Sequence, residues 1–78
     1  MNQITLSKAI PGETYTILKI ANEKRLFNRI SSMGLMTGGQ IEICQNKKKQ
    51  PVLIYARDTL IAIGRKESEK ILVGGNKQ

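Results

Sequence analysis

Residues 22–43, NEKRLFNRISSMGLMTGGQIEI, change their hydrophobic period halfway along the stretch. In the second half, Ile41 and Ile43 alternate with polar residues, as in a strand with one buried face. In the first half, apolar side chains recur at the spacing of one helix face: Leu26, Phe27, Ile30 and Met33. The stretch therefore predicts a single amphipathic helix that leads directly into a β-sheet.

The ends of this helix are marked by residues with suitable backbone preferences. We expect the helix at about 23–33, with Asn22 as the residue that caps its first turn. Gly34 is expected to adopt the left-handed conformation that ends a helix, and Leu35 to fold back onto the last turn, as in a Schellman motif. Backbone roles at turns are expected for four glycines: Gly12, Gly34, Gly38 and Gly39.

Short apolar runs separated by polar turns fill the rest of the chain. They predict five or six short strands, at about 4–10, 15–20, 40–45, 52–56, 59–63 and 71–73. Because unpaired edges favour aggregation in so small a sheet, we expect the strands to curl into a barrel in which the last pairs near the first. The sequence thus predicts a mainly β fold, a small SH3-like barrel with one inserted α-helix.

The connections between these runs differ in composition. Arg57 and Asp58 separate two apolar runs and predict a tight hairpin without the usual glycine. Residues 46–51 are polar up to the proline and are expected to form an exposed loop. We expect a short helical turn near 65–70 and a flexible tail at 74–78.

The length and composition indicate one small domain. The 78 residues form a single domain at most, with its core at about 4–73. Only three residues are aromatic, Tyr15, Phe27 and Tyr55, and we expect all of them in an otherwise aliphatic core. The chain has no histidine and one cysteine, Cys44, which we expect to be packed in its strand. This composition argues against an internal disulfide, a zinc site or another bound cofactor.

No pattern in the chain points to catalysis. A nucleophile such as Ser31 or Ser32 needs a base to activate it, and the sequence has no histidine for that role. We therefore expect a binding protein rather than an enzyme. The first residues do not resemble a secretion signal, and no apolar stretch is long enough to cross a bilayer. These features predict a cytoplasmic protein.

The chain is strongly basic, with thirteen Lys and Arg against six Asp and Glu and a formal charge of +7. Such a charge favours acidic proteins, nucleic acids or anionic membrane surfaces as partners. Arg25 and Arg29, four residues apart on the helix, are either docking residues or part of a solvated face. Lys47, Lys48 and Lys49 form a basic loop that either grips phosphates or is only solvated.

Two apolar residues follow the end of the helix and are further candidates for contact with a partner. Leu35 is explained more simply by core packing, whereas Met36 stands beside Thr37 and is expected to be exposed. A methionine is a flexible and polarisable side chain that adapts to many surfaces. Leu35 and Met36 therefore join the two arginines as predicted partner-binding residues.

The order of these features resembles the ferrous iron transport protein A (FeoA) family. Residues 6–12 match the family's leading Leu-x-x-x-x-x-Gly segment. Residues 29–38, RISSMGLMTG, resemble Arg-Leu-x-x-Leu-Gly-Leu-x-Pro-Gly, the motif in which the family's helix closes. The later strands look similar as well, so the resemblance extends over about 4–73. Thr37 stands where the family usually has proline, and residues 47–50 lack the glycines common in that loop.

The resemblance implies a small cytoplasmic accessory or regulator of ferrous iron uptake. Family members act beside FeoB, the membrane transporter with a cytosolic G-protein domain, and are not enzymes. The implied mode of action is protein–protein contact with the cytosolic portion of FeoB, which would place the chain at the inner membrane. Weak self-association is compatible with this role.

Two alternatives remain open. One is a nucleic-acid-binding SH3-like module that uses the lysine loop. The other is a free-standing adaptor related to the SH3-like domain of metal-dependent repressors. Because the sequence contains no DNA-reading helix-turn-helix, such a chain could not repress alone and would act by docking.

Overall fold

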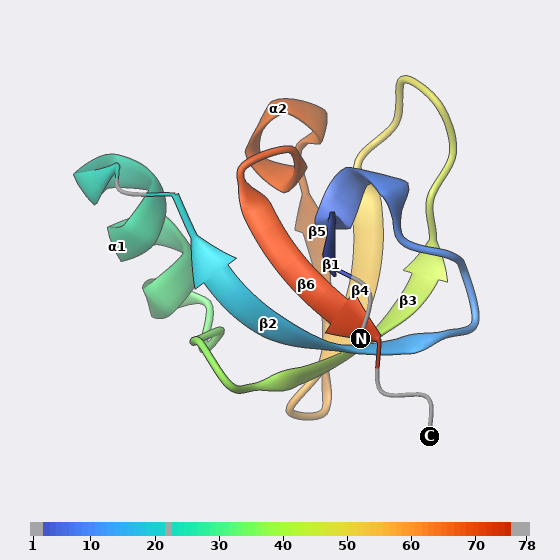
Figure 1. Ribbon diagram of the computed structural model, residues 1–78, viewed down its shortest axis with the longest axis horizontal. Coiled ribbons are helices and arrows are strands. Elements are labelled where there is room, and N and C mark those ends of the chain that lie inside the picture. Colours follow the sequence, from blue (N-terminus) through green and yellow to red (C-terminus); the bar gives the residue numbers. More distant parts are fainter. Residues whose placement is uncertain (1–2, 22, 76–78) are drawn as a thin grey trace.

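Strands hold more residues than helices do in the structure (Figure 1), a computed structural model that describes residues 3–21 and 23–75. In chain order the elements are β1 (Gln3–Thr5), the 3-10 helix η1 (Leu6–Lys8), β2 (Thr14–Ile20), α1 (Lys24–Ser32), β3 (Gln40–Gln45), β4 (Val52–Ala56), β5 (Thr59–Ile63), α2 (Arg65–Ser68) and β6 (Ile71–Gly75). The mainly β class, the inserted helix and the helical turn near residues 65–70 are therefore confirmed.

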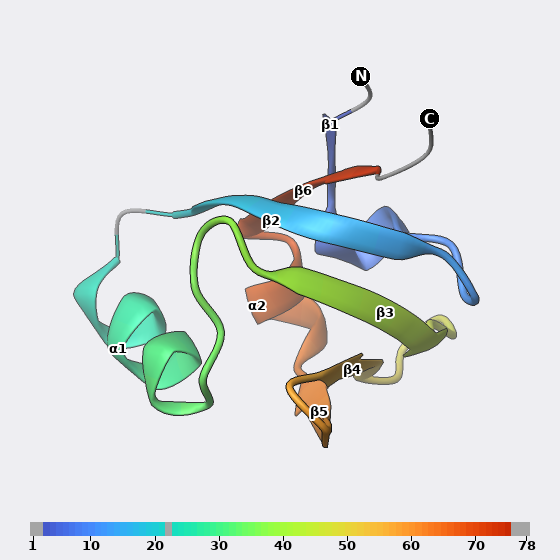
Figure 2. The same cartoon turned by 90° about the horizontal axis from the view of Figure 1, so that it is seen from below.

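The described strands form one antiparallel sheet with the order β1-β6-β2-β3-β4-β5. The sheet bends so strongly that β2 and β6 lie opposite β4 and β5, with α2 between the two halves (Figure 2). β6 pairs with both β1 and β2, so the last strand does close onto the first ones, as predicted. Within the described residues β1 and β5 are the ends of the sheet, and the barrel is open between them.

An aliphatic core fills the space between the two halves of the sheet. Alternation along β3 and β4 points every second side chain inward, and a bulge in the pairing of β2 with β6 turns Ile20 inward as well. The largest fully buried apolar side chains come from η1, α1 and strands β2 to β6: Leu6, Ile17, Ile30, Ile41, Ile43, Ile54, Ile63, Ile71, Val52 and Val73.

Three residues that we expected in the interior lie at the surface. Phe27 is 50% exposed, Tyr55 is 43% exposed, and Cys44 is also exposed, whereas Tyr15 is buried as predicted. Tyr55 stands between two buried residues and Cys44 follows the buried Ile43, so the alternation of a strand turns both outward. Phe27 follows Leu26 on α1, and a rotation of about 100° per residue lets only one of the two face the sheet.

Helix α1 ends in the Schellman motif that the sequence predicts. The Gly34 N–H donates to the Ser31 carbonyl at 2.9 Å, and the Leu35 N–H donates to the Ile30 carbonyl at 3.2 Å. Gly34 has a φ of +88°, a conformation that a residue with a Cβ adopts only with strain. At the other end Glu23 is the N-cap residue and makes no side-chain cap hydrogen bond. Asn22, which we expected in that role, lies outside the described residues.

The glycine pair after α1 joins the helix to the sheet. The Gly38 N–H donates to the Ile17 carbonyl at 2.7 Å, and the Ile17 N–H donates to the Gly39 carbonyl at 2.9 Å. Gly38 and Gly12 have positive φ, whereas Gly39 is close-packed, with the Met36 carbonyl oxygen 3.1 Å from where a Cβ would stand. The turn therefore continues the pairing of β2 beyond the start of β3.

Two further turns bear on the predictions. Arg57 and Asp58 both have positive φ, at 53° and 62°, and form the two-residue hairpin turn between β4 and β5. Two non-glycine residues thus adopt the conformation of a type I′ turn. Gly74 and Gly75, which we expected in the tail, instead extend β6 and pair with β2. Residues 76–78 of that tail lie outside the described part.

Candidate functional site

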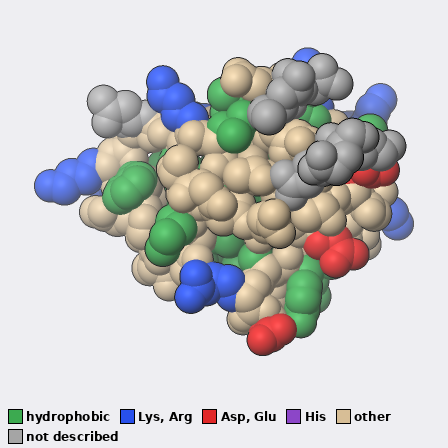
Figure 3. Space-filling view, turned by 60° about the horizontal axis from the view of Figure 1, so that its bottom comes forward, with side chains coloured by type: hydrophobic (Ala, Val, Ile, Leu, Met, Phe, Trp, Pro, Cys, Tyr) green, Lys and Arg blue, Asp and Glu red, His purple; other side chains and the backbone are tan. Residues whose placement is uncertain are grey.

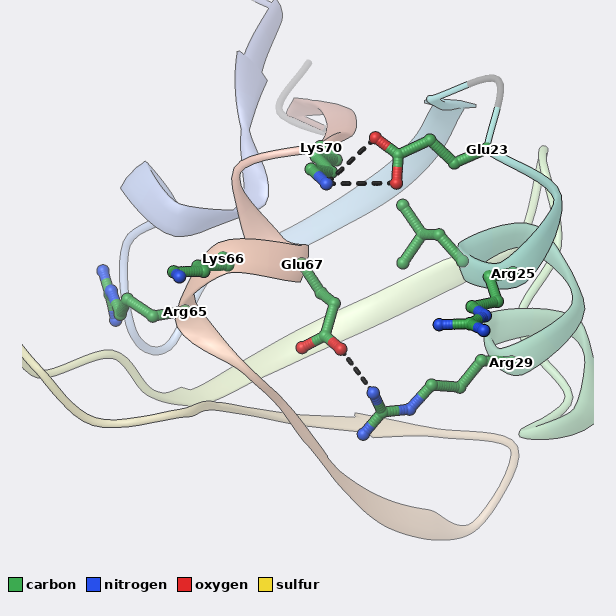
Figure 4. A pocket seen from close by; sticks show the side chains of 8 residues that line it. Glu23, Arg25, Arg29, Arg65, Lys66, Glu67 and Lys70 are labelled. Carbon is green, nitrogen blue, oxygen red and sulfur yellow. Dashed lines mark hydrogen bonds and ion pairs between the residues drawn. The ribbon is translucent and has the colours of Figure 1, made fainter.

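A groove of about 600 Å³ lies between α1 and α2 (Figure 4). Five of its lining residues are basic, two are acidic and one is apolar: Arg25, Arg29, Arg65, Lys66, Lys70, Glu23, Glu67 and Leu26. The structure thus brings the two arginines predicted as docking residues together with α2 and the turn that follows it. The sequence did not single out the residues of α2.

Both acidic side chains of the groove are already paired with basic ones. Lys70 Nζ lies 2.9 Å from Glu23 Oε2, and the Arg29 guanidinium pairs with the Glu67 carboxylate (Figure 4). The side chains of Arg29, Lys70 and Glu23 are 60%, 45% and 49% exposed, and that of Glu67 is 29% exposed. Exposed ion pairs contribute only about 0–1 kcal/mol, so they are easily exchanged for contacts with a partner.

Two cations of the groove have no such counterpart. Arg25 and Lys66 are exposed, and neither side chain makes a hydrogen bond or an ion pair within residues 3–21 and 23–75. The Arg25 side chain extends from α1 into the groove, beside that of Arg29 (Figure 4). The uncompensated charge of the groove is therefore positive.

Arg65 lines the groove but directs its guanidinium elsewhere. Its Nη1 donates to Asn46 Oδ1 at 2.7 Å, to the Gln50 carbonyl at 3.0 Å and to the Lys47 carbonyl at 3.1 Å. Its Nη2 donates to the Ser7 carbonyl at 2.9 Å. One planar side chain thus joins α2 to η1 and to both sides of the loop between β3 and β4.

Asn46 completes this network from the loop side. Its Nδ2 donates to the Ala9 carbonyl at 2.7 Å and to the Ser7 carbonyl at 3.0 Å. The predicted loop at residues 46–51 is exposed, with Lys47, Lys48 and Lys49 at the surface, but its base is fixed. On the face drawn in Figure 3, Lys and Arg side chains are spread around the outline rather than gathered in one patch. The lysine loop is thus one basic region among several.

The two apolar docking candidates differ in exposure. Leu35 is 4% exposed and belongs to the core, so its side chain is not available to a partner. Met36 is 57% exposed, as expected. Neither residue lines the groove between α1 and α2. We therefore keep Arg25 and Arg29 as groove residues and treat Met36 as a separate exposed position.

Two features are absent from the described residues, and both bear on other kinds of site. In residues 3–21 and 23–75, no three His, Cys, Asp or Glu side chains come together as they would around a metal ion. Among the described helices, none has the length and apolar character that a membrane-spanning helix needs.

The fold recurs in solved structures of two kinds of protein. A crystal structure of an iron uptake regulatory protein, FeoA, has a TM-score of 0.87 at 24% identity and covers 92% of this chain and 96% of its own. The NMR structure of a FeoA-like protein from Clostridium acetobutylicum has a TM-score of 0.84 at 21% identity and covers 100% of this chain and 92% of its own. A manganese-dependent transcriptional repressor has a TM-score of 0.85 at 13% identity and covers 94% of this chain and 41% of its own. These likenesses show the fold, which is SH3-like as predicted.

Sequence comparison identifies the family. None of the curated proteins that we compared matches the chain. The family model described as the FeoA domain matches residues 4–74, which is nearly the whole chain. This match confirms the resemblance seen in residues 6–12 and 29–38. The chain belongs to the FeoA family.

Proposed function

We propose that this protein is a small accessory of ferrous iron uptake that acts by protein–protein contact with the FeoB transporter. The match of the FeoA family model to residues 4–74 carries this proposal, because it ties the chain to ferrous iron uptake. In this role the protein works in the cytoplasm, at the inner membrane when FeoB is bound. It regulates or assembles the transporter and catalyses no reaction itself.

The surface between α1 and α2 supports a role in contact with another protein. The groove is open, its two ion pairs are exposed, and Arg25 and Lys66 are free of partners within the described residues. Charged groups at the surface of a small protein steer a partner of opposite charge and fix its orientation. The free cations can therefore attract an acidic partner, and the exposed ion pairs can be replaced by contacts with it.

Direct binding to the transporter tests the proposal. FeoB held in nanodiscs exposes its cytosolic portion, and we expect the full chain to bind it in at least one of three states: without nucleotide, with GDP or with a non-hydrolysable GTP analogue. Calorimetry or surface plasmon resonance gives the affinity in each state. Deletion of the gene should lower ferrous iron uptake by cells. Absence of binding in all three states, together with unchanged uptake, would contradict the proposal.

The basic loop favours a second candidate, a nucleic-acid-binding module. Lys47, Lys48 and Lys49 are exposed on a loop whose base is fixed, and the chain carries a formal charge of +7. Binding through this loop would release counterions, so its affinity would fall steeply with salt. Replacing the three lysines with glutamate is expected to abolish any binding to single-stranded DNA at low salt while changing the affinity for FeoB by less than about threefold. Loss of FeoB binding in this variant, with DNA binding retained, would contradict both assignments.

The likeness to the manganese-dependent repressor supports a third candidate function, an adaptor related to the SH3-like domain of such repressors. The chain spans about two fifths of that protein, so it corresponds to one part of the repressor. A free-standing copy of such a part would act by docking on a DNA-binding partner. Capture of a repressor in place of the transporter would favour this candidate.

A further inference from the structure

We infer that the groove between α1 and α2 is the docking site of this protein and that its occupant is an acidic segment of the protein partner. This inference rests on the proposed function and adds to it the surface and the chemistry of the partner. It is carried by the charges along the groove, which five basic and two acidic residues line, although one of the basic residues, Arg65, directs its guanidinium elsewhere.

The free cations define what the groove attracts. Glu23 and Glu67 are paired with Lys70 and Arg29, so they do not neutralise Arg25 and Lys66. Arg25 lies on α1 and points into the groove, whereas Lys66 lies on α2 with its side chain on the side turned away from α1 (Figure 4). A segment that carries carboxylates therefore meets Arg25 inside the groove and Lys66 at the outer edge of α2. Charge-assisted hydrogen bonds of this kind are among the stronger polar contacts of an interface.

Arg29 gives the groove a contact that a partner can take over. Its guanidinium is held by Glu67 in a pair whose arginine is 60% exposed. Because Arg25 and Arg29 are four residues apart on one helix, both guanidinium groups are within reach of one acidic stretch. An incoming carboxylate replaces Glu67 at Arg29 with little loss of free energy, since exposed pairs of this kind stabilise the fold weakly.

The mixture of charges favours a protein segment over a nucleic acid. A phosphate backbone carries uniform negative charge and would meet the Glu23 and Glu67 carboxylates as well as the cations. The groove also has no aromatic lining residue among those described, whereas binders of single strands stack bases on aromatic rings. A peptide that carries carboxylates together with amide and basic donors matches both signs of charge.

Binding of FeoB in nanodiscs by full-length variants tests the site. The variant Arg25→Glu/Lys66→Glu reverses the two free cations and is expected to bind at least about tenfold more weakly at low salt. The matched control Lys47→Glu/Lys48→Glu makes the same change in net charge at exposed positions of the lysine loop and is expected to stay within about threefold of the unmodified chain. Thermal unfolding verifies that both variants fold. Equal losses in the two variants would overturn the site.

A substitution with the opposite sign strengthens the test. Glu67→Gln keeps the shape of the side chain and removes the internal competitor for Arg29. We expect it to bind FeoB about two- to threefold more tightly. Weaker binding by Glu67→Gln would contradict the inference, because it would mean that the partner needs the carboxylate at this position.

A second probe separates this inference from the proposed function. In an NMR titration with a peptide that carries glutamates together with glutamine and lysine, the amide shifts should concentrate in α1 and α2 and disappear in Arg25→Glu/Lys66→Glu. If the chain does not bind FeoB but shows this pattern, the proposed function fails and the acidic docking site stands. If it binds FeoB equally well with the groove reversed, the function stands and the site fails. Shifts confined to residues 46–51, or stronger groove shifts with oligo-dT than with the peptide, would also overturn the site.

Discussion

Replacing Ile30 with alanine is expected to lower the free energy of unfolding by about 2–5 kcal/mol. The Ile30 side chain is 1% exposed and, with Leu26, forms the buried face by which α1 covers the core. Alanine removes several buried carbon atoms and leaves a cavity, and its better helix propensity offsets less than about 1 kcal/mol of the loss. Small domains have a total stability of about 5–15 kcal/mol, so this change brings the protein close to unfolding at 37 °C. Urea denaturation followed by circular dichroism measures the difference.

Phe27→Ala on the same helix is the matched control. It removes a larger apolar side chain, but that side chain is 50% exposed. If burial rather than hydrophobicity decides the effect, Phe27→Ala should be clearly less destabilising than Ile30→Ala. A loss below about 0.5 kcal/mol for Ile30→Ala, or the reverse order of the two variants, would contradict the way the helix faces the sheet.

The parts of the fold that depend on neighbours in sequence could be predicted from the sequence. The apolar spacing in α1 and the glycine after it are local features, and the helix and its Schellman end follow from them. The hairpin at Arg57 and Asp58 was predicted from the two polar residues between apolar runs. The alternation of buried and exposed residues along β3 and β4 also predicts that Tyr55 and Cys44 point outward. Their residue types favour burial, but their positions in the alternation decide their exposure, so the prediction of burial was wrong for both.

Only the α1 wall of the groove could be predicted from the sequence, because the α2 wall comes from a distant part of the chain. Arg25 and Arg29 stand out on a predicted helix, since their spacing places them on one face. Their partners on α2 are some 40 residues further along, as in the pair of Arg29 with Glu67, 38 positions away. A polar stretch of a single helical turn has no periodicity that would show which side chains point toward α1. The pairing of β6 with β2 sets that position, and it is a property of the folded sheet.

The contacts of Arg65 also join distant parts of the chain and could not be predicted from the sequence. Its substitution gives the second large expected effect on stability. We expect Arg65→Lys to lower the free energy of unfolding by about 1–3 kcal/mol, although the substitution keeps the charge. The guanidinium donates to four acceptors in η1 and the β3–β4 loop, at 2.7 to 3.1 Å. An ammonium group has three donors at a single point and does not reproduce this planar arrangement. The Ser7 carbonyl keeps its bond from Asn46, whereas the Lys47 and Gln50 carbonyls lose the contact that fixes the loop.

The consequence should be local disorder as well as lost stability. In Arg65→Lys the backbone order parameters of residues 46–51 are expected to fall below about 0.6, the range of flexible segments, while those of α1 stay unchanged. Lys66→Ala, at the next position of the same helix, removes an exposed side chain with no hydrogen bond or ion pair to the described residues and is the matched control. It should leave both the stability and the loop order as they are. Because the Arg65 guanidinium binds the base of the lysine loop and η1, Arg65→Lys should loosen the loop without reversing any charge in the groove. Unchanged order in residues 46–51 together with a loss below about 0.5 kcal/mol would show that the four hydrogen bonds of Arg65 do not hold the loop.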